Sequence, residues 1–393
     1  MNTLDIGHHA TIELIESYLD QLNATKFDGL RLPDKPIKAA GLGGESALIQ
    51  CLLTWARKNP TGSVITPLKL GVPSEEEHSL KHLSSRAYSF VAMLAANDVL
   101  AADQSTSIRA RTNRACSLRV DAMARGLQKA AFGHRTFLAC VDHSTKANIP
   151  AFYFADGTLR NRNEFADLAE ELLMSRAAAY TKRNIANATR RGLGVLLYEL
   201  IKNTNDWGRT DLGNAPLRPS LRGILFTRFN MLVSGALASA GGNSQLESFV
   251  KNMGSQSKDG YVRFLELSVF DSGPGLAVRW LNRAVEGDVS LSDELDACFS
   301  CLSKHRTTSG ASTRGLGLYY VMKTLHDLRA YVRLRTGRLA LCRSFVNAPL
   351  RDSERLNGPE LYDWRSETLE PTSMPLAEGT LFSIVIPLVE EAE

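Results

Sequence analysis

The stretch VFDSGPGLAVRW, residues 269–280, decides how the whole chain is interpreted. A strand-like apolar run ends in Asp271, and Gly273 and Gly275 follow with a proline between them. Taken alone, this is a turn, because Asp, Ser, Gly and Pro are the ordinary turn residues. A buried strand that ends in a carboxylate beside bare backbone raises the question of a binding role, which the rest of the chain has to answer.

Composition and length describe a globular protein with more than one domain. The 393 residues are many for one core and predict two domains, or three, and the 44% hydrophobic and 22% charged residues are ordinary. No apolar run is long enough to span a bilayer, so no membrane association is expected. The N-terminus lacks the order of a signal peptide, and six thinly spread cysteines suit reduced thiols, so a cytoplasmic location is expected. The first residues predict an amphipathic helix with Ile12, Ile15, Tyr18, Leu19 and Leu22 on one face.

The charge is mild in sum but uneven along the chain. A net charge of +4 and a pI of about 8.7 are too modest to imply nucleic acid. Residues 109–135 are strongly basic, and such a face can meet nucleic acid or an acidic partner. A solvated helix face is favoured, because no interleaved pattern of stacking aromatic residues accompanies the cations. The cations are Arg109, Arg111, Arg114, Arg119, Arg125, Lys129 and Arg135, against Asp121.

A polar stripe marks the predicted helix LGVLLYELIKNTNDW, residues 193–207. Glu199, Asn203 and Asp206 stand at i, i+4 and i+7, so they share one helical face. A plain amphipathic helix would explain the leucines on the other side. Asn and Asp are poor helix formers, however, and Lys or Glu would serve a surface better. The choice of residues therefore indicates a use for the stripe.

Glycines open a second predicted helix in STRGLGLYYVMKTL, residues 312–325. Gly315 and Gly317 precede the apolar helical run, and Arg314 stands beside them. A helix start of this kind leaves N–H groups open to an anion, and the helix dipole favours negative charge there. Close packing of the backbone also calls for glycine.

The order of these segments along the chain strengthens the functional interpretation of each one. It runs from the Glu/Asn helix through the Asp-x-Gly-x-Gly strand end, a polar segment at 276–314 and the glycine-opened helix to a last strand that begins at Gly379 and Thr380. This order resembles the GHKL superfamily of gyrase, heat-shock chaperones, histidine kinases and MutL. ELIKNTNDW is similar to its N box, DSGPG to its first glycine box, TRGLGL to its second, and GTLFSIVIP to its closing strand. The resemblance covers roughly residues 165–390.

The resemblance implies a Bergerat-type α/β sandwich, a mixed sheet with helices on one face, over residues 161–393. Residues 1–160 are expected to form a smaller α/β domain of unknown role, in which 135–142 and 149–157 make a strand pair. The polar segment 276–314 is expected to be a lid that is mobile without ligand.

By resemblance, the site binds ATP and Mg²⁺. Asp271 would accept a hydrogen bond from the adenine amine, Thr380 would complete the base contact, and Asn203 would coordinate Mg²⁺. The glycine-opened helix would cradle the phosphates, with Arg314, and Lys304 or His305, adding positive charge. The expected ATP-binding residues are Asn203, Asp206, Asp271, Gly273, Gly275, Lys304, Arg314, Gly315, Leu316, Gly317 and Thr380.

Glu199 bears on the activity. Chaperone, gyrase and MutL members carry Glu here as the base that activates water, so the resemblance implies a Mg²⁺-dependent ATPase acting as a conformational switch. Lys202 departs from the pattern, and the transducer domain that normally supplies a catalytic lysine is not recognisable, so hydrolysis is expected to be slow. A protein kinase acting on a partner and a non-catalytic nucleotide sensor remain alternatives. A protein partner or a homodimer is expected, with the oligomeric state open.

Two further patterns are weaker. Cys298 and Cys301 form one C-x-x-C, but zinc needs a second pair, so two plain thiols are favoured. His78 and His82 stand at i and i+4 without an evident third ligand, so a solvated helix face is favoured.

Overall fold

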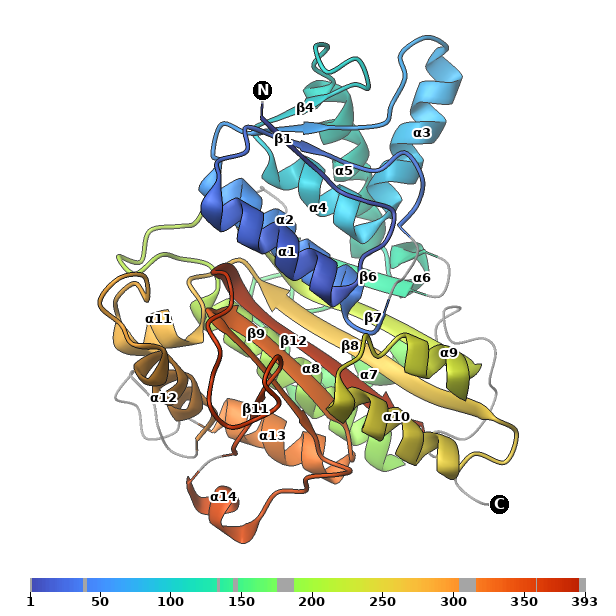
Figure 1. Ribbon diagram of the computed structural model, residues 1–393. Coiled ribbons are helices and arrows are strands. Elements are labelled where there is room, and N and C mark those ends of the chain that lie inside the picture. Colours follow the sequence, from blue (N-terminus) through green and yellow to red (C-terminus); the bar gives the residue numbers. More distant parts are fainter. Residues whose placement is uncertain are drawn as a thin grey trace.

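The computed structural model contains two β-sheets and the helices that connect and cover them (Figure 1). Within the described part of the chain, no helix has both the length and the apolar character needed to cross a membrane. The structure describes residues 2–37, 41–132, 135–143, 148–174, 187–303, 316–357 and 359–388.

The smaller sheet is parallel and belongs to the N-terminal part. Its four strands follow one another in the order β1-β2-β3-β4, and helices make the crossovers that parallel neighbours require. The middle residue of each strand is buried in one row: Leu4, Leu30, Val64 and Val99. The strands are β1 (Thr3–Asp5), β2 (Gly29–Arg31), β3 (Ser63–Ile65) and β4 (Asp98–Leu100). The helices of this part are α1 (Ile12–Ala24), α2 (Gly44–Lys58), α3 (Pro73–Ser85), α4 (Ala87–Ala95), α5 (Arg109–Ala124) and α6 (Leu127–Ala130).

The larger sheet has eight strands in the order β11-β10-β9-β12-β8-β7-β6-β5. Every pairing in it is antiparallel, so the expectation of a mixed sheet is wrong. The only parallel pairings lie in the separate small sheet within the described chain, and the α/β class itself is confirmed. The strands are β5 (Ala131–Phe132), β6 (Arg135–Val141), β7 (Leu221–Leu232), β8 (Tyr261–Asp271), β9 (Tyr331–Gly337), β10 (Leu339–Ser344), β11 (Tyr362–Asp363) and β12 (Ala377–Pro387).

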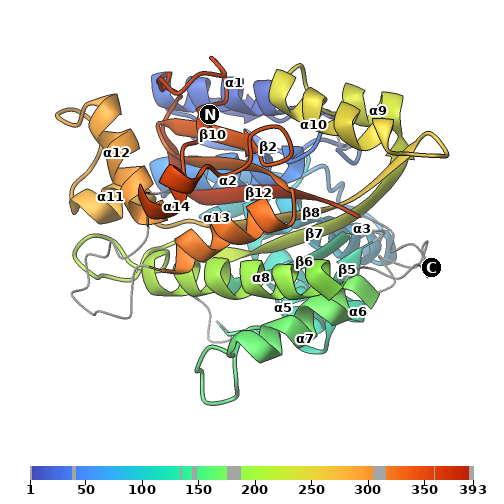
Figure 2. The same ribbon diagram turned by 90° about the horizontal axis from the view of Figure 1, so that it is seen from below.

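Helices cover both faces of the larger sheet (Figures 1 and 2). On one face lies α8 (Asn187–Trp207), with α7 (Arg162–Met174) and α13 (Gly317–Asp327) packed beside it. On the opposite face, α1 and α2 lie between the larger sheet and the small parallel sheet. The expectation of helices on one face only is therefore wrong, because helices of the N-terminal part cover the second face.

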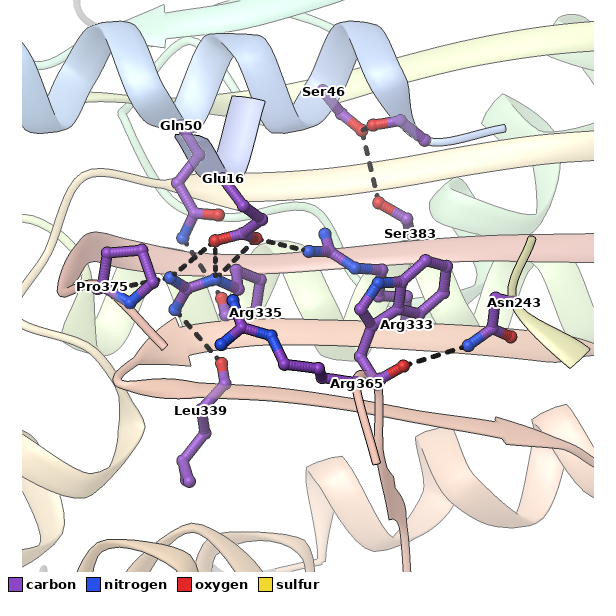
Figure 3. A network of polar contacts seen from close by, with 12 residues as sticks. Glu16, Ser46, Gln50, Asn243, Arg333, Arg335, Leu339, Arg365, Pro375 and Ser383 are labelled. Carbon is purple, nitrogen blue, oxygen red and sulfur yellow. Dashed lines mark hydrogen bonds and ion pairs between the residues drawn. The ribbon is translucent and has the colours of Figure 1, made fainter. Parts of the chain in front are cut away.

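Buried charge explains why the N-terminal helices sit on that face (Figure 3). The sheet presents Arg333 and Arg335 there, and both are almost completely buried. Glu16 of α1 accepts hydrogen bonds from Arg333 Nη2 at 2.7 Å and from Arg335 Nε at 3.0 Å. Burial would raise the pKa of Glu16, but the two guanidinium groups outweigh it and lower the pKa. Because a buried guanidinium is costly without a partner, the sheet and α1 depend on each other.

Polar contacts continue along α2. Ser46 Oγ lies 3.2 Å from Ser383 Oγ and accepts a hydrogen bond from Ser268 Oγ at 2.9 Å. Gln50 Nε2 donates to the carbonyl oxygens of Arg335 and Glu378 at 3.2 and 3.1 Å. This face is thus partly polar, and α1 and α2 supply hydrogen-bond partners for several of its polar groups.

The predicted strand pair at 135–142 and 149–157 is wrong. The first segment is β6, which lies between β5 and β7 in the larger sheet. In the second segment only an isolated bridge forms, between Tyr153 and Leu159. The two sheets therefore divide the chain between β4 and β5, earlier than residue 160. The division into domains at 160 stays a prediction.

Most of the expected lid is folded and anchored. Residues 276–303 contain α11 (Leu276–Leu281) and α12 (Leu291–Leu302), where Ser290 caps the second helix by accepting from Asp293 N at 3.0 Å. Glu294 is 0% exposed and accepts from Arg338 Nε at 2.7 Å and Arg338 N at 2.8 Å. Residues 304–315 lie outside the described part of the chain.

The remaining helices are α9 (Val233–Ala238), α10 (Ser244–Ser255) and α14 (Asp352–Asn357).

Candidate functional site

Asp271 is the last residue of β8 and is only 4% exposed. Gly273 N donates to Asp271 Oδ1 at 2.8 Å, and the backbone of Thr380 also donates to this carboxyl group. Burial raises the pKa of Asp271 to about 6, although these two hydrogen bonds act in the opposite direction. The strand therefore ends in a rigidly held acceptor whose charge changes near neutral pH.

Glycines surround this carboxylate because the backbone approaches it closely. Gly208 follows α8, and a Cβ there would lie 2.8 Å from the Cβ of Asp271. Gly379, with φ of +75°, sits at the bulge of β12, where a Cβ would collide with the Asp271 carbonyl oxygen. Gly273 is equally tight, since its Cβ would lie 2.7 Å from Gly208 Cα. The end of α8, the first glycine box and the Gly-Thr strand therefore meet at Asp271.

Gly275 has a structural task in the same turn. Its φ is +93°, and a Cβ there would lie 2.8 Å from Thr336 Oγ1. The same hydroxyl accepts a hydrogen bond from Leu276 N at 3.1 Å and so holds the start of α11. The turn that the opening residues suggest is present, and it fixes α11 beside the buried carboxylate.

Glu199 lies farther back on α8 and is only 6% exposed. Its Oε1 pairs with the guanidinium of Arg162, at the start of α7. A Cβ on Gly317, the first residue of α13, would lie 2.8 Å from Glu199 Oε2. Leu316 is the N-cap residue of α13, and its side chain makes no capping hydrogen bond. The candidate base therefore touches the helix end at which the sequence predicts phosphate binding.

The sequence reasoning missed Arg162. Asn161 and Glu164 form a capping box, in which Asn161 Oδ1 accepts from Asn163 N at 2.9 Å and Glu164 Oε2 accepts from Asn161 N at 2.7 Å. This box sets where α7 begins and so places Arg162 over α8. The Asn-x-x-Glu spacing is a readable signal for the helix start, but the pairing of Arg162 with Glu199 joins two helices and has no local signal.

Asn203 and Asp206 complete the predicted stripe. Asn203 is half-buried, one turn beyond Glu199, and its amide makes no hydrogen bond to another residue in the described ranges. Asp206 is engaged already, because Lys202 Nζ pairs with Oδ2 and Asn205 Nδ2 donates to Oδ1 at 3.1 Å. Among the described residues, nothing occupies the Asn203 amide, whereas Asp206 is exposed and paired with its neighbours on the helix.

The predicted motifs gather at two points along α8. From Glu199 to Gly208 the helix rises about 13 Å, with Gly317 at one point and Asp271, Gly273 and Gly379 at the other. A nucleoside triphosphate stretched from its base to its last phosphate covers such a span. Lys304, His305, Arg314 and Gly315 lie outside the described residues, so their predicted roles stay predictions.

The basic segment is largely occupied by contacts within the chain. Arg111 pairs with Glu76, Arg135 with Glu45, and Arg109 donates to the Met93 carbonyl oxygen. Arg119 is buried and donates to the carbonyl oxygens of Lys129 and Ala130. Arg109, Arg111 and Arg119 hold α5 against its neighbours, and Arg135 joins β6 to α2. These contacts favour the structural interpretation over nucleic-acid binding.

The thiol and imidazole patterns form no metal site in the described ranges, where no three His, Cys, Asp or Glu side chains are grouped suitably. Burial raises the pKa of Cys301 to about 12 and that of Cys298 well above its ordinary value. Both thiols in α12 are therefore protonated packing groups.

Comparisons with known proteins identify no relative. No family model, no curated protein and no solved structure matches the chain.

Proposed function

We propose that this protein binds Mg²⁺-ATP along α8 and hydrolyses it slowly, as a nucleotide-driven conformational switch of the GHKL type. One observation carries the proposal. Three segments that are far apart in the sequence gather along α8: Gly317 lies against Glu199, Asp271 lies against Gly208, and Gly379 lies against Asp271. A turn with no function would not need a buried carboxylate and three close glycines at the end of a core strand.

The residues present fit an adenine nucleotide. Asp271 offers a buried acceptor to the adenine amine, and the nearby glycines leave the backbone bare for a flat base. The N-terminus of α13 offers N–H groups to phosphate oxygens. Asn203 supplies an uncommitted amide oxygen, which suits Mg²⁺ because that ion usually takes one or two protein oxygens and otherwise phosphate and water. When bound, Mg²⁺ would offset the charge of the phosphates.

Glu199 has the chemistry of a general base. Its carboxylate would accept a proton from a water molecule whose oxygen bonds to the terminal phosphorus. The bond from that phosphorus to the bridging oxygen breaks, and ADP leaves with the electron pair. General-base help of this kind accounts for a factor of about 100 to 10,000 in rate.

Titration calorimetry with a non-hydrolysable ATP analogue and Mg²⁺ tests binding. We expect the wild type to bind and Asp271→Asn to bind much more weakly, while Asp259→Asn, an exposed aspartate before β8, serves as the matched control. No heat from the wild type, or equal affinity of Asp271→Asn, would overturn the site.

Radiolabelled γ-phosphate distinguishes the activities. Free phosphate indicates an ATPase, labelled protein indicates a kinase, and neither indicates a nucleotide sensor. Glu199→Ala should retain binding and lose phosphate release. Phosphate release by Glu199→Ala at the wild-type rate would remove Glu199 from the mechanism.

A further inference from the structure

The clearest unassigned feature beside the proposed site is Arg162. We propose that Arg162 is the positioning residue for Glu199, holding the carboxylate charged and aimed at the N-terminus of α13. This inference rests on the proposed function, because it concerns how the candidate base of that site is kept ready.

The burial of Glu199 is the first reason. With 6% exposure, the carboxylate has lost most of its water, and an isolated buried carboxylate tends to take up a proton. Arg162 supplies the opposite charge from α7, and within the described ranges it is the cation paired with Glu199. The other groups near the pair are Tyr198 of α8 and Tyr320 of α13. Lys202 is turned to Asp206 instead.

Two aromatic rings and a helix cap hold the guanidinium in place. Arg162 Cζ lies 5.6 Å from the centre of the Tyr198 ring and 5.1 Å from that of Tyr320. The side chain is still 49% exposed, so the rings and the ion pair orient it, since burial does not. One residue thereby connects α7, the helix of the base and the helix of the predicted phosphate site.

The chemical consequence follows from what a base must do. A protonated Glu199 could not take a proton from water, and a carboxylate turned away from α13 would not face the reacting phosphorus. The pair with Oε1 leaves Oε2 against Gly317, on the side of the predicted phosphates. Arg162 thus keeps one oxygen occupied and the other available.

The test compares the pH dependence of phosphate release in wild type, Arg162→Met, Arg162→Lys and Arg190→Met. Arg190 is a matched control, because it pairs with Glu170 at 3.5 Å between the same two helices. In Arg162→Met we expect kcat to fall about tenfold or more at neutral pH. We also expect the acid limb of the kcat-against-pH profile to move to higher pH by about 1 to 3 units, because the cation beside Glu199 is lost.

Arg162→Lys should return the acid limb towards the wild-type position but recover kcat only in part, because an ammonium lacks the planar fork. Arg190→Met should match the wild type in both respects. The proposal would be overturned if Arg162→Met kept both the rate and the acid limb of the wild type. A faster rate in Arg162→Met would also overturn it, because it would show that the ion pair restrains the base.

A second measurement does not depend on hydrolysis. The Glu199 carboxylate is titrated by infrared difference spectroscopy of each protein against its Glu199→Gln counterpart. We expect the pH midpoint of this carboxylate titration to rise in Arg162→Met and to stay unchanged in Arg190→Met. An unchanged midpoint in Arg162→Met overturns the inference, whereas a raised midpoint in a protein that releases no phosphate supports the positioning role and overturns the ATPase alone.

Discussion

Gly379 lies so close to Asp271 that any side chain at position 379 would collide with the Asp271 carbonyl oxygen. The two residues belong to neighbouring strands, and the bulge of β12 brings them together just where Thr380 donates to the Asp271 carboxyl group. The Gly-Thr pair at the start of the last strand is therefore a geometric requirement of the buried carboxylate.

Gly379→Ala should be strongly destabilising. The methyl group would overlap the carbonyl oxygen, and alanine would have to adopt φ of +75°. Overpacking of a core costs about 1–3 kcal/mol, and a left-handed backbone about 1–2 kcal/mol more. Urea unfolding measures the loss, with Gly71→Ala as control, because a Cβ at Gly71 meets nothing within 4 Å. Equal stability of the two variants would contradict the close approach.

Glu16→Gln should also destabilise the fold, since it leaves Arg333 and Arg335 buried without a counter-charge. Removing one partner of a buried pair costs about 3–5 kcal/mol. The exposed Glu13 of the same helix provides the matched control Glu13→Gln. Because the pKa of Glu16 is lowered in the folded state, its contribution is present above pH 4.5 and lost as the pH falls through the folded pKa. Unfolding at pH 7 with no difference between the variants would contradict the role of the pair.

Burial of Glu266 predicts that stability falls as the pH rises from 5 to 8. Loss of solvation raises its pKa to about 7, while a hydrogen bond from Gly43 and the charge of Arg135 lower it and Glu45 raises it. Because the pKa is raised in the folded state, the folded protein holds this proton more tightly than the unfolded chain does. The folded state therefore loses stability as the pH rises and Glu266 ionises. A shift of this size corresponds to at most about 3 kcal/mol. Glu266→Gln should flatten the unfolding profile, and an unchanged slope would assign the pH dependence elsewhere.

Local patterns revealed what depends on local geometry. Gly273, Gly275 and Gly379 could be predicted because close backbone approach admits only glycine, and such positions stand out in a sequence. The N-terminal helix was predicted from Ile12, Ile15, Tyr18, Leu19 and Leu22, and the structure confirms that all five are buried in α1. Glu16 lies within that same face, and a carboxylate there was a sign of a buried partner that the apolar pattern alone did not reveal.

Long-range pairing could not be predicted in the same way. The β6 segment was paired with residues 149–157, because neighbours in sequence were taken as neighbours in space. It pairs instead with β7, which begins at Leu221, eighty residues after β6 ends at Val141. The lid was expected to be mobile from its polar composition, but Glu294 of α12 is buried and accepts hydrogen bonds from Arg338, which lies in the turn between β9 and β10. Arg162 likewise meets Glu199 only after three helices pack.

Asp271 predicts a pH-dependent choice of base. Adenine presents an amine donor, which pairs with an ionised carboxylate, whereas hypoxanthine presents a carbonyl acceptor at the same position. Because burial raises the pKa of Asp271 to about 6, the group is ionised at pH 8 and mostly protonated at pH 5, where it becomes a donor itself. The affinity for non-hydrolysable ITP, relative to the ATP analogue, should therefore rise below pH 6.

The relative affinity for the ITP analogue can rise by at most about tenfold for each pH unit below the pKa of Asp271. Titration calorimetry of both analogues at pH 8, 6 and 5 measures it, and protonation of the phosphates cancels in the ratio because the two nucleotides share them. Asp271→Asn has no group at this position that titrates between pH 5 and 8, so its affinity ratio should stay flat. A wild-type ratio that is constant over this range, or one that changes equally in Asp271→Asn, would show that this carboxylate does not read the base.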